Sequence, residues 1–353
     1  MKKLSVKKVL KGDITTYAIV ILAYLVVELL KSTGHLSSLM EGLLVPICTY
    51  VILAISLNLV VGILGELSLG HAGFMCVGAF TSAFFSRLTA NTITVNWVRF
   101  LLALLIGTVC AGIFGILIGI PVLKLNGDYL AIVTLAFGEI IKNVVNVLYI
   151  GKDAKGIHIA TKNIASDLSE GGDMIVKGPQ GITGTPNDST FTIGVILILI
   201  TIFVVANLTK SRTGRAIMSI RDNRIAAESV GINITKFKLL SFAISAALAG
   251  TAGVLYSHNL FTLSATPKNF GYNMSIMILV FVVLGGMGSI KGSMIAAVAL
   301  TVLPEMLRFL NDYRMLIYAI VLIVMMLYNW SPKCKELRER YSIKRLFHKK
   351  EEA

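Results

Sequence analysis

The chain has 353 residues, of which 55% are hydrophobic and only 15% charged, whereas about a quarter of the residues of a soluble domain are charged. Its net charge of +14 comes from basic residues that flank apolar runs, which argues against nucleic-acid binding and for a protein that spans a membrane. The four cysteines have the spacing of neither a metal site nor a disulfide framework, so we expect no metal and no cofactor.

The first residues are basic, and a long apolar run follows them. This order resembles a secretory signal, but the run over residues 14–30 lacks a small-residue cleavage site and is long for a signal. We therefore predict a basic cytoplasmic N-terminus over residues 1–13 and a first membrane span over 14–30.

Apolar runs long enough to cross about 30 Å of hydrocarbon recur along the chain. They predict an all-α integral membrane protein with about ten transmembrane helices. The predicted spans are 14–30, 43–64, 70–88, 97–120, 129–150, 191–208, 238–257, 271–287, 292–310 and 312–330. We expect a single polytopic domain over 14–330, with spans 2–5 and 7–10 as candidates for an internal repeat. A basic cytoplasmic tail follows over 331–353.

The positions of the basic residues predict an orientation. When the N-terminus is placed in the cytoplasm and the spans alternate, most of the 33 lysines and arginines lie inside, as the positive-inside rule requires. Both termini are then cytoplasmic. The long hydrophilic stretch 151–190 becomes an outside loop, and residues 209–237 become an inside loop.

Small residues recur within two of the spans. Gly107, Ala111, Gly115 and Gly119 share one helical face because they are four residues apart, and Ala246, Ala249, Gly250 and Gly253 repeat the pattern. Small residues let helix backbones approach closely in lipid. The pattern therefore predicts faces on which helices pack.

Polar residues inside the apolar regions are candidates for the translocation pathway. Glu139 lies three residues before Lys142, so the two share a helical face and can pair. A lone charge at mid-bilayer costs at least about 2.5 kcal/mol, so Glu139 either lines the pathway or ties two spans together. His71, at a sharp turn, is either a structural histidine or part of a gate. The candidate pathway residues are Glu66, Ser68, His71, Thr134 and Glu139.

The inside loop reads as two short helices with a bend. Asp222 or Asn223 can cap the second helix, Gly231 suits the left-handed position that ends it, and Thr235 can cap the next span. These signals predict that the loop is structured.

The second short helix carries a small apolar face. Ile225, Ala226 and Val230 form this face, and Arg224 and Glu228 bound it. A compact capped helix of this kind can seat in a cleft of a partner protein. The alternative is an amphipathic linker that lies on the membrane surface.

The sequence contains no motif of a known enzyme class. It has no G-x-x-x-x-G-K-[ST] phosphate-binding loop, no H-E-x-x-H pair and no G-x-S-x-G elbow. We therefore expect no catalytic residues in this chain and no ATP hydrolysis by it.

Several stretches together resemble the LivM-type permeases of branched-chain amino acid ABC importers. They are GELSLGHAGF over residues 65–74, NGDYLAIVTLAFGEI over 126–140, GPQGI over 178–182, the loop over 212–238 and LGGMGS over 284–289. These stretches occur in order over most of the chain between about residues 45 and 330.

The resemblance implies partners rather than a catalytic centre. It implies a second, LivH-like permease subunit, two ATP-binding cassette subunits and an external solute-binding protein, in a bacterial or archaeal plasma membrane. The inside loop becomes the element that docks on the ATPase, with Ala226, Ala227, Glu228 and Gly231 matching the family's docking motif. Together with Arg215 and Arg224 on the same segment, these are the candidate coupling residues.

The mechanism that this implies is ATP-driven alternating access. The cargo would be a branched-chain or other hydrophobic amino acid, and the main alternative is a urea or short-chain amide permease of the same architecture. An ion-coupled secondary transporter is a more distant alternative, because it would need more intramembrane carboxylates than Glu139.

Overall fold

The computed structural model describes residues 6–35, 37–90, 92–125, 127–153, 156–162 and 172–307, together with isolated positions between 313 and 327. Contacts within the chain define two compact units, Met1–Val298 and Ala299–Ala353. All contacts discussed below lie within the first unit.

Helices dominate the described residues, which is consistent with the predicted all-α membrane protein, although a small sheet is also present. They are α1 (Val6–Ser32), α2 (Ser38–Asn58), α3 (His71–Leu88), α4 (Asn96–Val122), α5 (Asp128–Val147), α6 (Phe191–Lys210), α7 (Arg212–Asp222), α8 (Arg224–Ser229), α9 (Ile234–Ser257), α10 (Pro267–Phe270), α11 (Tyr272–Gly285) and α12 (Ile290–Met306). A π-helical turn, η1 (Leu59–Leu64), continues α2, and a short 3₁₀ turn, η2, covers Gly178–Gln180.

Seven helical segments among the described residues are long and apolar enough to cross a membrane. They are Ile14–Ser32, Ser38–Leu64, Asn96–Val122, Asp128–Val147, Phe191–Lys210, Ile234–Ser257 and Pro267–Gly285. The predicted spans 70–88 and 292–310 correspond to α3 and α12, which have 18 and 17 residues. The predicted span 312–330 lies largely outside the described residues, and the tail 331–353 lies wholly outside them.

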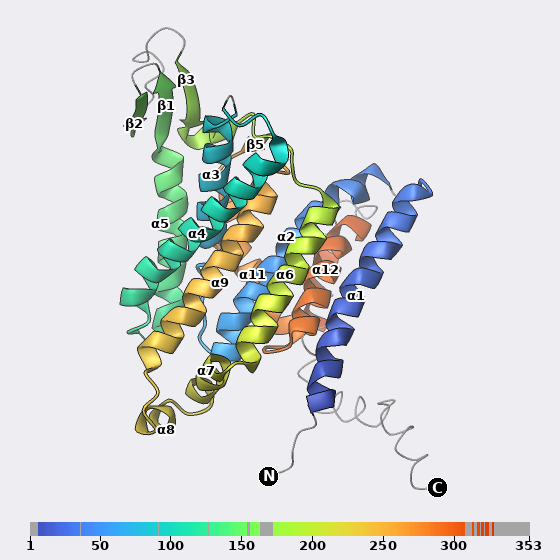
Figure 1. The fold of residues 1–353 in the computed structure, drawn as a ribbon, viewed down its shortest axis with the longest axis vertical. Helices are drawn as coiled ribbons and strands as arrows, with labels where there is room; N and C mark the ends of the chain where they lie inside the picture. The colour runs from blue at the N-terminus through green and yellow to red at the C-terminus, as the bar shows by residue number, and fades with distance from the viewer. Residues whose placement is uncertain are drawn as a thin grey trace. The chain divides into compact units, whose positions relative to one another are not determined.

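α9 is the central helix, and it packs on α2, α3 and α4 (Figure 1). The predicted small-residue faces form this packing. A Cβ atom added to Gly115 would lie 2.5 Å from the Cβ of Ala246, and one added to Gly250 would lie 2.4 Å from the Cβ of Ala111. The stripes on α4 and α9 therefore meet each other, as close helix approach in lipid requires.

A small antiparallel sheet lies at one end of the helices, and α7 and α8 lie at the other (Figure 1). Its strands are β1 (Tyr149–Asp153), β2 (Gly156–Ala160), β3 (Asp173–Lys177), β4 (Ile182–Thr183) and β5 (Thr262–Leu263), in the order β2-β1-β3-β4-β5. The sequence predicted only a hydrophilic loop over 151–190. The alternation of apolar and polar residues along β1 to β4 is too short to predict strands from the sequence. The fifth strand, β5, belongs to a different loop, which follows α9.

Candidate coupling segment and the turn between α2 and α3

The two short helices between α6 and α9, here called the coupling segment (residues 211–233), are defined by four local signals. The side chains of Ser211, Asn223 and Asn233 each accept a hydrogen bond from a backbone N–H three residues later, at 3.0–3.1 Å. Gly231 has a φ of +85° and ends α8 through a bond from its N–H to the Glu228 carbonyl at 2.9 Å. The sequence predicted the left-handed Gly231 and offered Asp222 or Asn223 as the cap, and the structure shows that Asn223 is the capping residue.

The predicted cap at Thr235 is wrong. Asn233 occupies the capping position, and its side chain accepts from the Lys236 N–H. Thr235 lies inside α9, because that helix begins one residue earlier, at Ile234. Asn is the better capping residue of the two, since its short side chain reaches the free N–H groups readily.

A small apolar core fixes how the coupling segment folds on itself. Ile220 of α7, Ala227 of α8 and Ile234 of α9 are buried together, and Ile232 and Phe237 pack against them. Ala227, one of the predicted coupling residues, is therefore part of the internal packing and does not face outward.

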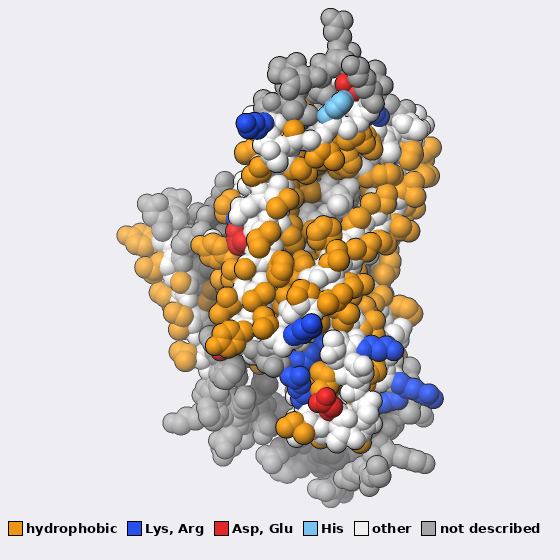
Figure 2. Space-filling model, turned by 90° about the vertical axis from the view of Figure 1, so that its left-hand side faces the viewer, with side chains coloured by type: hydrophobic (Ala, Val, Ile, Leu, Met, Phe, Trp, Pro, Cys, Tyr) orange, Lys and Arg blue, Asp and Glu red, His pale blue; other side chains and the backbone are white. Residues whose placement is uncertain are grey.

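The outer side of α8 is exposed. Ile225 and Val230 have 81% and 76% of their surface exposed, and Ala226, Glu228 and Gly231 are exposed beside them. Lys and Arg side chains gather around this end of the molecule, below a broad apolar surface (Figure 2). An exposed apolar patch bounded by charged residues can contact a partner protein or a membrane surface, so the exposure of α8 fits both alternatives that the sequence left open.

Arg215 and Arg224 both lie exposed on the segment. Arg215 also donates a hydrogen bond from Nη1 to the Lys210 carbonyl at 3.2 Å, at the C-terminal end of α6. A cation at the C-terminus of a helix stabilises it. Arg215 therefore holds α7 to α6, which the sequence alone did not indicate.

The chain between η1 and α3, here called the α2–α3 turn (residues 65–70), has no regular secondary structure. Its Leu69 N–H donates to the Thr134 hydroxyl of α5 at 3.0 Å. His71, the first residue of α3, bonds through Nε2 to the Ser56 hydroxyl of α2 at 2.7 Å. These two hydrogen bonds hold the turn and the start of α3 against α5 and α2.

The structure brings three of the predicted pathway residues together at this turn. Ser68, His71 and Thr134 are all at least 98% buried. The hydroxyl of Ser68 has no hydrogen-bond partner among the described residues. The His71 side chain, in contrast, bonds to Ser56 of α2, and the Thr134 hydroxyl accepts from the Leu69 N–H of the turn.

The other two predicted pathway residues, Glu66 and Glu139, form ion pairs with lysines. The Glu66 carboxylate pairs with the ammonium of Lys238 on α9. The Glu139 carboxylate pairs with Lys142, as the three-residue spacing predicted, and its Oε1 also accepts from the Tyr272 N–H at 2.7 Å. Glu139 thus ties α5 to the start of α11, a long-range contact that sequence spacing does not reveal.

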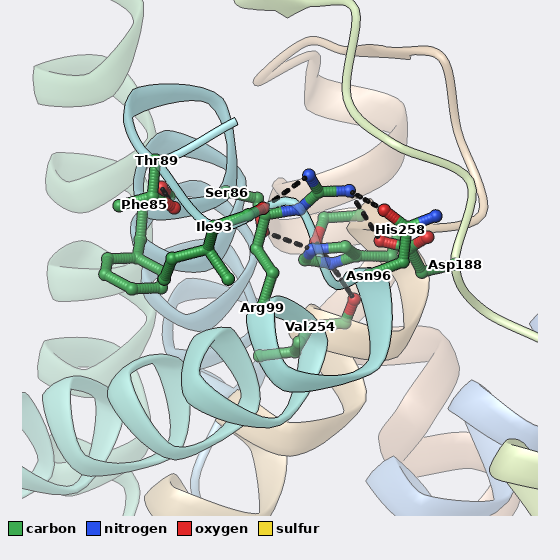
Figure 3. A network of polar contacts seen from close by, with 10 residues as sticks. Phe85, Ser86, Thr89, Ile93, Asn96, Arg99, Asp188, Val254 and His258 are labelled. Carbon is green, nitrogen blue, oxygen red and sulfur yellow. Dashed lines mark hydrogen bonds and ion pairs between the residues drawn. The ribbon is translucent and has the colours of Figure 1, made fainter. Parts of the chain in front are cut away.

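A polar network at the sheet end of the helices was not predicted (Figure 3). Arg99 of α4 is 7% exposed, donates to the Asn96 side chain at 3.0 Å and lies 3.5 Å from an Asp188 oxygen. His258, just beyond α9, bonds through Nε2 to the Ser86 hydroxyl at 2.9 Å, and burial holds the pKa of its imidazole below the usual value. The network joins the ends of α3, α4, α6 and α9. Arg99 and Asp188 are 89 positions apart, so no sequence pattern links them.

The described residues contain no group of His, Cys, Asp or Glu side chains that could hold a metal ion.

Comparison with known proteins places this architecture in one family. The family model for the branched-chain amino acid transport system permease component matches residues 39–326. The high-affinity branched-chain amino acid transport system permease protein LivM of Salmonella typhimurium is 36% identical over 294 residues, which cover 80% of this chain and 67% of that protein.

More distant relatives include LivH of Salmonella typhimurium, 25% identical with coverage of 72% of this chain and 80% of that protein. The ribose import permease protein RbsC of Haemophilus influenzae is 27% identical over 78% of this chain and 80% of its own length. No solved structure gave a significant match. The chain belongs to the family of branched-chain amino acid transport system permease components.

Proposed function

We propose that this protein is the membrane-spanning permease subunit of an ABC importer that carries branched-chain amino acids. The observation that carries the proposal is the 36% identity to LivM over 80% of the chain, which is higher than the 27% identity to the ribose permease. The exposed, capped α8 supports it, because a permease of this kind needs a surface on which a separate ATPase can act.

The partners in this proposal are a second LivH-like permease, two ATP-binding cassette subunits and an external solute-binding protein. The exposed face of α8, with Arg224, Ala226, Glu228 and Gly231, would dock on an ATPase subunit. Arg215 and Ala227 would act indirectly, since one holds α7 to α6 and the other fills the core of the segment. ATP binding by the partners would then favour one permease arrangement over the other.

The topology in this proposal has ten spans in one polytopic domain over 14–330, both termini in the cytoplasm and a plasma-membrane location. The sheet end would face outside, and α7 and α8 would face the cytoplasm. A single thiol label tests this orientation. Ile225→Cys, in a chain expressed without its ATPases and with its four native cysteines replaced, should react only when the reagent reaches the cytoplasmic side, and labelling from outside would overturn the orientation.

The pathway in this proposal passes the α2–α3 turn, with Glu66, Ser68, His71, Thr134 and Glu139 along it. An irregular segment between helices is where transporters commonly place substrate contacts. The burial of Ser68, His71 and Thr134 at one junction of α2, α3 and α5 supports this placement.

The decisive experiment is uptake of labelled leucine and labelled urea by cells with and without this gene. Loss of ATP-dependent leucine uptake alone supports the proposed cargo. Loss of urea uptake alone would support the proposed importer architecture but show that the cargo is urea. Unchanged uptake of both, in cells shown to lack other importers for them, would overturn the proposed cargo.

A further inference from the structure

The end of the π-helical turn η1 is bonded to a residue that lies far away in the sequence. η1 ends at Leu64, and the residue that follows it, Gly65, has a φ of +83°, so the last carbonyls of the helix need partners from elsewhere. The Gly62 carbonyl accepts a hydrogen bond from Nη1 of Arg221 at 3.0 Å. Arg221 therefore places a cation at the C-terminus of the continuous helix formed by α2 and η1, where the helix dipole favours it.

Arg221 is fixed on its own side by the coupling segment. It is the next residue after Ile220, which is buried with Ala227 of α8. Its Nε and Nη2 donate to Asp222 Oδ1 at 3.2 and 3.1 Å, which leaves Nη1 directed to Gly62. Because α7 and α8 share this core, a shift of α8 must move Arg221.

η1 also packs closely against the turn between α11 and α12. A Cβ atom added to Gly62 would lie 2.2 Å from the backbone nitrogen of Gly288. The Gly288 N–H also donates to the Asn58 side chain at 2.8 Å. Near Arg221 the packing is equally tight, since a Cβ atom on Gly65 would lie 2.5 Å from the Cγ of Arg221.

We propose that Arg221 is the positioning residue that transmits movement of the α7–α8 segment to η1, and through Gly62 to the turn at Gly286–Ser289. π-helical turns occur frequently at functional sites and hinges, and close-packed contacts transmit strain because they leave no free volume. η1 also leads directly into the α2–α3 turn, so the same contact would set the entrance to the polar cluster at Ser68 and His71. The inference rests on the proposed function, since it needs an ATPase to act on α8.

The test uses the complete importer, assembled with its partner permease, ATPases and binding protein, in vesicles. Three variants are compared: Arg221→Ala, Arg221→Lys and the matched control Arg212→Ala, an exposed arginine of the same helix. The measurements are substrate transported per ATP hydrolysed and the amount of assembled complex. A second readout is independent of cargo: the labelling rate of Met287→Cys, a residue 56% exposed in the Gly286–Ser289 turn, with and without ATP. The native cysteines of the complex, four of them in this chain, are replaced for this measurement.

We expect Arg221→Ala to assemble and hydrolyse ATP but to transport about tenfold less per ATP, as loss of a hydrogen bond to a charged group predicts. The ATP-dependent change in Met287→Cys labelling should disappear with it. Arg221→Lys should recover part of the transport per ATP and part of the labelling change. Its ammonium can donate to the Gly62 carbonyl, but it lacks the planar guanidinium that also donates to Asp222. Arg212→Ala should behave as wild type.

Two results would overturn the inference. One is an Arg221→Ala complex that keeps wild-type transport per ATP and ATP-dependent labelling. The other is a fall in transport that only follows the amount of assembled complex, which would make Arg221 merely structural. If the cargo assignment fails instead, wild type transports no leucine but its labelling still responds to ATP, so the two failures are distinguishable.

Discussion

The Glu66 carboxylate and the Lys238 ammonium form an ion pair that joins the α2–α3 turn to the N-terminal end of α9, across 172 positions of sequence. Both side chains are largely withdrawn from solvent, with 15% and 3% exposed. Together with the Arg221 contact to Gly62, this pair anchors the chain between η1 and α3 at its start.

Removing one member of this pair should destabilise the protein more than removing both. Glu66→Ala leaves Lys238 buried without its counter-charge, which costs about 3–5 kcal/mol in buried pairs, whereas an apolar replacement of both partners is often neutral. Thermal unfolding in detergent should therefore show a large drop in Tm for Glu66→Ala and a partial recovery for Glu66→Ala/Lys238→Met.

The exposed pair Lys31–Glu41, at 2.8 Å with about half of each side chain exposed, is the control. Glu41→Ala should leave the Tm nearly unchanged, because exposed pairs contribute little. Equal losses for the single and double variants at Glu66 and Lys238 would contradict the prediction.

Gly231→Pro should abolish transport while the protein still inserts. Proline fixes φ near −65° and lacks the N–H group, whereas Gly231 has a φ of +85° and its N–H bonds to Glu228. The end of α8 must therefore rearrange. Uptake and membrane content of the variant are the measurements.

Gly34 provides a matched control for this substitution. It also has a positive φ, of +71°, its N–H bonds to Lys31 at 3.2 Å, and neither glycine has a neighbour within 4 Å of an added Cβ atom. Gly34→Pro imposes the same backbone change far from the coupling segment in sequence and should retain uptake. Normal uptake by Gly231→Pro would reject docking at α8.

Gly115→Ala should destabilise the packing of α4 on α9. The added methyl group would lie 2.5 Å from the Cβ of Ala246, and overpacking of this kind costs about 1–3 kcal/mol. The expected result is a lower Tm in detergent.

Gly112 lies one turn earlier on α4 and serves as the control. A Cβ atom there would lie 3.4 Å from the Cβ of Ala247, which is an ordinary contact, and alanine is a better helix former than glycine. Gly112→Ala should therefore match or exceed the wild-type Tm. An equal effect at both positions would show that the helices do not meet along the Gly115 face.

Glu139→Gln should separate the pathway role of Glu139 from its structural role. Glutamine keeps an oxygen that can accept from the Tyr272 N–H but removes the charge that pairs with Lys142. If Glu139 lines the pathway, the assembled complex persists and its transport kinetics change. Unchanged uptake kinetics would leave Glu139 as a tie between α5 and α11 only.

Much of the local structure follows from sequence because the interacting groups are close along the chain. The pair at Glu139 and Lys142, the left-handed Gly231 and the small-residue faces of α4 and α9 each depend on a fixed spacing within one helix or turn. The cap of α8 was narrowed to Asp222 or Asn223 in the same way. Where two residues of similar chemistry compete locally, the pattern is less decisive, and the choice of Thr235 over Asn233 as a cap was wrong for that reason.

The sequence by itself determined that this chain spans a membrane, which segments form its helices and to which family it is similar, because hydropathy, helix periodicity and motif order are properties of the chain. Only the tertiary structure decided which polar residues from distant parts of the chain pair with each other, and therefore which helices they connect. Glu66 with Lys238, Arg221 with Gly62, and Arg99 with Asp188 connect positions between 89 and 172 residues apart, and the strands β4 and β5 pair across two separate loops. Such contacts depend on which helix faces meet, and that is set by the packing of the whole bundle rather than by any local pattern.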